Sequence, residues 1–160
     1  MKAYSFLNTV VVVAAPPAIP AVQITGWADG DDAIMITRRN DAATDKMGAD
    51  GKMAVAISAD KSGEITFKLM QTSSGNKVLN AIASRQEGGP STFAPVQVQF
   101  QDTYRQDVGA GTAGYIKKRP EVNRGAGINT QEWVIVVERL DLLLGDPAFA
   151  GMATAVAEAG

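Results

Sequence analysis

The sequence predicts a mainly β fold, an antiparallel β-sandwich or barrel with one flanking α-helix. Short segments of alternating apolar and polar residues recur along the 160-residue chain, and turn-forming residues separate them. Helical periodicity is found in one segment, and neither an internal repeat nor a change of composition marks a second domain. We therefore expect a single domain over residues 1–160 that is large enough to bury its own core.

Three strands are expected in the N-terminal part of the chain. Residues 4–13 are β-branched and become apolar on both faces, which is typical of a strand covered from two sides. The prolines within residues 16–20 should end this strand, because proline cannot donate a hydrogen bond to a β-ladder. Residues 22–25 and 33–37 are expected as the second and third strands, on either side of an acidic turn.

The longest polar segment covers residues 38–52 and is expected to be a long loop or a protruding hairpin. Loops of this length in compact domains are usually functional or disordered. Its charged residues are of both signs.

A β-hairpin is expected next, because residues 53–57 and 65–69 both alternate and flank a turn at residues 60–63. Residues 75–86 then have the periodicity of an amphipathic helix, which a serine at position 73 or 74 can cap. This helix should pack its apolar face on the sheet. The residues of that face are Val78, Leu79 and Ile82.

Three further strands are expected in the second half of the chain. Residues 96–101 alternate between apolar residues and glutamines, another strand begins at Tyr115, and residues 133–137 are apolar on most of both faces. The Ala- and Gly-rich residues 146–160 are at best weakly helical and are expected to lie against a neighbour. The side chains expected in the core or between subunits are Val11, Val13, Trp133, Ile135 and Val137.

The composition argues against an enzyme, a metal protein and a nucleic-acid binder. The chain has no cysteine and no histidine, which removes disulfides, thiolate chemistry and the commonest general base. Its net charge of −2 gives no basic footprint for phosphates. Nothing singles out a carboxylate pair for glycoside hydrolysis, although such a pair is a spatial property that sequence leaves open. We expect no catalytic residue, cofactor or metal.

Three short motifs each have a functional and a structural interpretation. Residues 109–114 match the dinucleotide-binding pattern, but no helix follows, so a flexible glycine-rich connection is expected. Asp29, Asp31 and Asp32 lack the order of a calcium loop and are interpreted as a solvated turn. The basic run at residues 117–119 is interpreted as a solvated strand end and not as a phosphate contact.

The N-terminus could be taken for a secretory signal, because Lys2 precedes an apolar run. Ser5, Asn8 and Thr9 interrupt that run, so a buried strand is the favoured interpretation. No apolar stretch approaches the ~20 residues of a membrane helix. The protein is expected to be soluble and intracellular, with no membrane partner.

The apolar strands also point to self-assembly. Segments as apolar as residues 10–13 and 134–137 must hide their edges and outer faces, and identical neighbours could cover them. A ring would use two different patches of each subunit. On this basis the strands are expected to be completed by copies of the same chain.

The chain resembles the tail tube proteins of contractile-tailed bacteriophages, a family of myophage structural proteins encoded beside the tail sheath. The matching blocks are residues 30–32 with 38–41, 48–53, 58–64 and 131–141. The likeness extends over residues 4–144 and is specific in the block of the expected hairpin and in the block around Trp133.

The resemblance implies a non-enzymatic virion subunit, assembled in the host cytoplasm, six to a ring, with rings stacked into a tube inside a contractile sheath. DNA would pass transiently through the lumen, which would also hold the tape measure protein. Sheath, baseplate and tail terminator proteins would be partners. The loop at residues 38–52 would join successive rings, because its mixed charges suit a contact that fixes register. Its candidate contact residues are Arg38, Arg39, Asp41, Asp45, Lys46, Asp50 and Lys52. The alternatives are the tube protein of a contractile injection system, a tail completion or neck ring protein, and, from another class, a β-sandwich binding module or a histidine-free glycosidase.

Overall fold

A computed structural model describes residues 5–6, 9–102 and 107–144 of the chain. These residues form nine strands and one helix, which confirms the predicted mainly β fold. The elements are β1 (Thr9–Ala15), β2 (Ile19–Gln23), β3 (Ile34–Arg38), β4 (Ala43–Met47), β5 (Met53–Ile57), β6 (Gly63–Met70), α1 (Gly75–Glu87), β7 (Val96–Asp102), β8 (Asp107–Lys118) and β9 (Thr130–Leu143). The start of the predicted first strand and the Ala- and Gly-rich tail lie largely or wholly outside the described residues.

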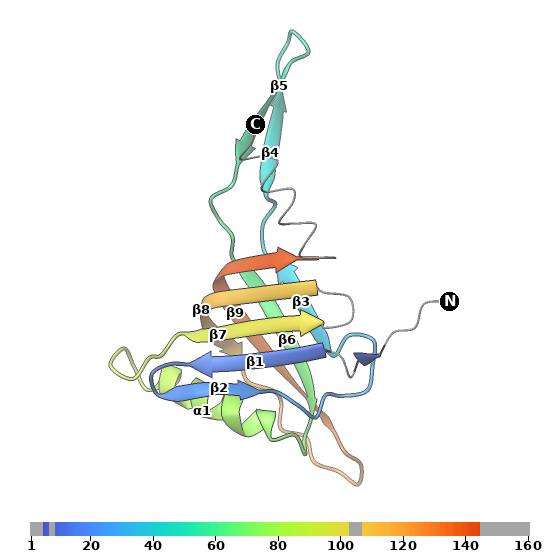
Figure 1. Cartoon of the computed structure of the whole chain (residues 1–160), viewed down its shortest axis with the longest axis vertical. Coiled ribbons are helices and arrows are strands. Elements are labelled where there is room, and N and C mark those ends of the chain that lie inside the picture. The colour runs from blue at the N-terminus through green and yellow to red at the C-terminus, as the bar shows by residue number, and fades with distance from the viewer. Residues whose placement is uncertain (1–4, 7–8, 103–106, 145–160) are drawn as a thin grey trace.

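Seven strands form one antiparallel sheet in the order β2-β1-β7-β8-β9-β6-β3, and β4 and β5 form a separate hairpin. The large sheet bends so that its two halves enclose the core, and α1 closes the open end (Figure 1). The helix packs against β2 and β8. The indole nitrogen of Trp133 in β9 donates a hydrogen bond of 2.9 Å to the side-chain oxygen of Asn76 in the helix. The expected sandwich or barrel is thus built from one sheet that folds over on itself.

Glycines in β8 allow the sheet to bend. Gly111 and Gly114 pair with successive inward-facing residues of β7, so that Thr112 and Ala113 form a bulge between them. A Cβ atom on Gly111 would lie 2.8 Å from a methyl group of Val137, and one on Gly114 would lie 2.9 Å from the same methyl group. The predicted flexible connection at residues 109–114 is therefore wrong, because these residues lie inside a strand whose corner has no room for side chains.

The core contains residues of the helix and of several strands whose burial alternates. Leu79 and Ile82 of α1 are fully buried, and Val78 packs against them from a half-buried position. Strand β1 alternates between buried and half-buried residues, so only one of its faces is fully covered. The predicted cover on the second face of this strand stays a prediction for an assembly of several chains. Pro20, expected to end a strand, lies inside β2, which is an edge strand and needs no outer donor.

The predicted hairpin between residues 53–57 and 65–69 is also wrong. Strand β5 pairs with β4, from Ala43 opposite Ile57 to Met47 opposite Met53. Strand β6 pairs with β9 and β3 instead. Alternation identified the faces of both strands, but it carries no information about which strand is the partner.

Candidate assembly surfaces

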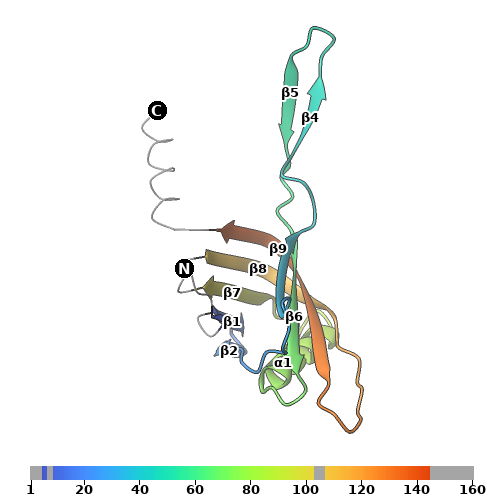
Figure 2. The same cartoon turned by 90° about the vertical axis from the view of Figure 1, so that its right-hand side faces the viewer.

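The hairpin of β4 and β5 extends far from the sheet and stands apart from it in both views (Figures 1 and 2). All residues of both strands are exposed. A two-stranded hairpin on its own is marginally stable in water. The segment is therefore a candidate for a contact with another molecule.

The two faces of this hairpin differ in chemistry. Strand pairing places one set of large apolar side chains on the same face, and they are 55–85% exposed. We call this set the apolar hairpin face: Met47, Met53, Val55 and Ile57. Asp45 lies within this face, directly opposite Val55, and the opposite face carries Thr44, Lys46 and two alanines. Exposed apolar side chains gathered on one face mark an interaction surface more often than a solvated one.

Hydrogen bonds fasten the base of the hairpin to the sheet. The guanidinium of Arg38 donates to the backbone oxygen of Leu140 at 2.8 Å, and the backbone nitrogen of Arg39 donates to Ser62 at 3.1 Å. Across the neck, the carboxylate of Asp60 accepts hydrogen bonds from Ser62 and Asn40, which hold the pKa of Asp60 below its ordinary value of 3.8. Two of the predicted contact residues, Arg38 and Arg39, thus belong to the base and not to the tip.

The tip contains a turn signal that the sequence interpretation did not use. Asp50 and Gly51 form an Asp-Gly pair, Gly51 has a φ of 82°, and the backbone nitrogen of Lys52 donates to the Asp50 carboxylate at 3.1 Å. Asp-Gly between two β segments is a strong short-range sign of a hairpin. This pair could have shown that residues 43–47 and 53–57 are partners.

The acidic turn and the basic run of the sequence meet on the body of the molecule. Asp29, Asp32, Lys118 and Arg119 line one open hollow of about 540 Å³, together with Lys68. Lys68 forms an ion pair of 2.5 Å with Asp32, which lowers the pKa of that carboxyl and raises the pKa of the lysine. Charges of both signs thus face one another across this hollow, which gives it neither the basic character of a phosphate site nor the acidic character of a cation site.

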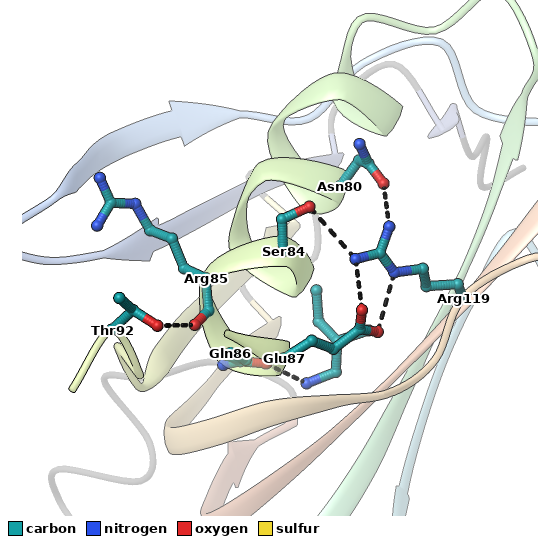
Figure 3. Close-up of polar contacts among 8 residues, drawn as sticks. Asn80, Ser84, Arg85, Gln86, Glu87, Thr92 and Arg119 are labelled. Carbon is teal, nitrogen blue, oxygen red and sulfur yellow. Dashed lines mark hydrogen bonds and ion pairs between the residues drawn. The ribbon is translucent and has the colours of Figure 1, made fainter. Parts of the chain in front are cut away.

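Arg119 is held against the helix and is not a freely solvated strand end (Figure 3). Its guanidinium binds the Glu87 carboxylate in a bidentate pair at 3.1 and 2.9 Å and donates to Asn80 at 2.7 Å. The side chain of Gln86 accepts a hydrogen bond of 2.8 Å from the backbone of Ile116. The C-terminal half of α1 is therefore tied to the end of β8, and the solvated interpretation of the basic run is wrong for Arg119.

Residues 1–145 match the family model described as the bacteriophage PhiTE tail tube protein. The chain belongs to this tail tube family. No curated protein matches the chain by sequence. The recognition made from the sequence blocks is thereby confirmed, and the family is one of structural proteins.

Two solved structures show that the fold of this tail tube family member also occurs in contractile injection systems. A chain of the PVC sheath-tube complex in its extended state is 9% identical, with a TM-score of 0.52, and the match covers 88% of this chain and 90% of that one. A chain of the PVC sheath/tube terminator is 11% identical, with a TM-score of 0.51, and covers 89% and 98%. At these identities the likeness concerns the fold alone.

The predicted core or inter-subunit side chains lie in the core of this tail tube fold. Val11, Val13, Trp133, Ile135 and Val137 are at most 2% exposed within the chain. The chain covers these inward side chains itself, and the cover of the strand edges and outer faces by copies of the chain stays a prediction. Exposed large apolar side chains are found elsewhere, and four of them lie on the hairpin.

Within the described ranges, no group of three or more acidic side chains is placed to hold a metal ion. The helix in that part of the chain is too short and too polar to cross a membrane.

Proposed function

We propose that this chain is the ring-forming subunit of a tail tube, with six copies in each ring and rings stacked inside a contractile sheath. The observation that carries the proposal is the apolar hairpin face, which the described part of the chain leaves uncovered. Fully burying an exposed Val, Ile or Met side chain stabilises a contact by about 1.5–3 kcal/mol. Four such residues on a projecting arm suit a contact with the next ring.

The charged residues of the hairpin would set the register of this contact. Asp45 lies among the apolar residues, Lys46 lies on the opposite face, Asp50 and Lys52 lie in the tip, and all four are exposed. Charges at the rim of an interface contribute more to orientation and specificity than to affinity. Arg38, Arg39 and Asp41 would act through the base, by fixing the direction in which the arm points.

The partners of the tube follow from the same proposal. A tube inside a sheath contacts sheath protein along its outer side, and terminator and baseplate proteins at its two ends. The tape measure protein and then DNA would occupy the lumen. The subunit would assemble in the host cytoplasm and end in the phage tail, and ejection would conduct DNA through the stacked rings.

Electron microscopy of purified protein tests the proposal. The native chain should form stacked rings, whereas the double variant Val55→Ser/Ile57→Ser should form single rings because its arm lacks apolar contact area. The matched control is Ala54→Ser/Ala56→Ser on the opposite hairpin face, which should still form tubes. A deletion must remove both strands, residues 43–57, because removing residues 42–49 alone would leave β5 without its partner.

The outcomes separate the alternatives. Single rings from the native chain would favour a completion or neck protein, and monomers at every concentration would contradict ring assembly altogether. Tubes from the Val55→Ser/Ile57→Ser variant would show that the hairpin does not join rings. Tubes that co-purify with a sheath in the absence of a capsid would favour an injection system.

A further inference from the structure

We propose that one half of the bent sheet, formed by β2, β1, β7 and the first part of β8, presents the wall of the conduit. The inference rests on the proposed tube and adds which surface faces the lumen. Its basis is an outward-facing set of residues without charge, which we call the uncharged strip. The strip consists of Gln23, Val10, Val12, Ala14, Gln97, Gln99, Gln101, Val108, Ala110 and Thr112.

Strand pairing places these residues on one face. Val12 lies opposite Gln23 on one side and opposite Gln99 on the other, and Gln99 lies opposite Ala110. The alternating neighbours, such as Val11 and Val98, are buried in the core. The strip is therefore the side of this half-sheet that faces away from the core.

Charges of these strands are kept off the strip. Strands β1 and β2 contain no charged residue at all. Asp102 of β7 and Asp107 of β8 lie opposite each other, in register with the core-facing residues. Charge returns at β9, where Arg139 and Asp141 form an ion pair of 3.1 Å with each other.

The other half of the same sheet has a different outer face. Glu64 and Lys68 of β6 and Glu132 of β9 point outward there. Lys117 of β8 forms an ion pair of 3.4 Å with Glu64. Because the sheet bends, the two halves face different directions (Figure 2). Among the described residues, one outer wall thus carries charges and the strip carries none, with Arg139 and Asp141 of β9 at its border, opposite Thr112 and Ala110.

Ring symmetry explains why the difference matters. Every residue of the strip would recur once per subunit around the lumen and again in each stacked ring. A lysine there would become rings of cations that hold the phosphates of DNA, and a carboxylate would become rings of anions that repel them. Glutamine amides stay hydrated without either effect.

The strip is also unlike a surface built for burial between subunits. Its three glutamines on β7 are exposed, and it contains no aromatic residue, whereas the centres of interfaces are rich in aromatic residues. The chemistry fits a wetted wall along which a polyanion moves without sites of retention.

Cysteine labelling of assembled tubes tests the inference, because the native chain contains no cysteine. Tubes of the Gln99→Cys variant are treated with a small maleimide dye or with maleimide-coated gold particles wider than the tube. A lumenal thiol should react with the dye and lose all reaction with gold, while disassembled subunits should react with both. Glu132→Cys, on the charged half, should not show this dye-only pattern in tubes.

Each outcome decides the matter. Gold on Gln99→Cys tubes would place the strip on the outside, and loss of both reactions would place it between subunits, and either result overturns the inference while leaving the tube intact. If Gln99→Cys blocks assembly, Gln101→Cys serves as the second variant. If the native chain forms no tubes, the proposed function fails and the inference fails with it.

Discussion

The sheet body and the β4–β5 hairpin have the same alternating strand pattern, but their apolar side chains lie in opposite environments. Ile65, Phe67 and Leu69 of β6 are at most 1% exposed, whereas Met53, Val55 and Ile57 of β5 are 55–85% exposed. Both segments alternate with the period of a half-buried strand. An alternating pattern thus specifies that a face is to be covered, and the topology decides whether the covering comes from the same chain or from another.

A charge placed in each region should give the largest difference in stability between the two, and so tests the comparison most directly. Ile82→Asp puts a carboxylate against the fully buried face of α1 and should lower the free energy of unfolding by about 3–5 kcal/mol. Val55→Asp makes a similar change on the exposed hairpin and should change it by less than about 0.5 kcal/mol. Denaturant unfolding of both variants measures the difference.

Assembly should respond in the reverse order, which is the control for this pair. Val55→Asp should stay folded and lose stacked rings in electron micrographs. Equal destabilisation by the two substitutions would show that the hairpin is covered within the chain, and the division into two regions would be wrong.

The next largest effect is expected at the corner of the sheet. Gly111→Ala places a methyl group 2.8 Å from Val137 in the packed core, and overpacking of this kind costs about 1–3 kcal/mol. Gly125→Ala is the matched control, because no atom lies within 4 Å of the added group. Thermal unfolding compares the two variants. An unchanged melting temperature of Gly111→Ala would show that Gly111 and Val137 have room for an added methyl group between them.

The tie between β8 and α1 should contribute less than the corner. Arg119→Ala removes a bidentate pair with Glu87, but both side chains are at least 36% exposed, so solvent screens the interaction. We expect a loss of about 1 kcal/mol in unfolding free energy. Arg124→Ala, which removes a bond to the neighbouring backbone oxygen, should change stability by less than about 0.5 kcal/mol. Equal losses would mean that Arg119 contributes no specific bond.

How much the sequence reveals differs between these regions for a physical reason. The helix at Gly75–Glu87 and the glutamine strand at Val96–Asp102 follow from local periodicity, and both were predicted. Strand pairing depends on contacts between distant segments, so alternation left the partner of β5 undetermined. Glycines are depleted in strands, which made residues 109–114 look like a connection until the packing of Val137 explained them.

The candidate site was predicted in part for a related reason. The polar segment at residues 38–52 contains β4 and the tip of the hairpin, and its charges were identified as contact residues. Met53, Val55 and Ile57 were assigned to a hairpin with residues 65–69, because nothing local distinguishes a strand that faces the core from one that faces a partner. The Asp50-Gly51 turn was the signal that could have corrected this.

The smallest effect is expected from the exposed ion pair between Asp32 and Lys68 on the body. Bonding to Lys68 lowers the pKa of Asp32 below 3.8, so the contribution of the pair is present above that pH and lost as the pH falls through the lowered value. The pKa of Lys68 is raised above 10.5, so the contribution is lost again as the pH rises through the raised value. Asp32→Asn should therefore differ from the native chain only between these limits. Denaturant unfolding across this range measures the difference, and high salt should shrink it because Asp32 is 54% exposed. A difference in unfolding free energy that is independent of pH would show that Asp32 acts through packing and not through its charge. Packing within the chain would then stabilise even this exposed part of the sheet body, in contrast to the hairpin.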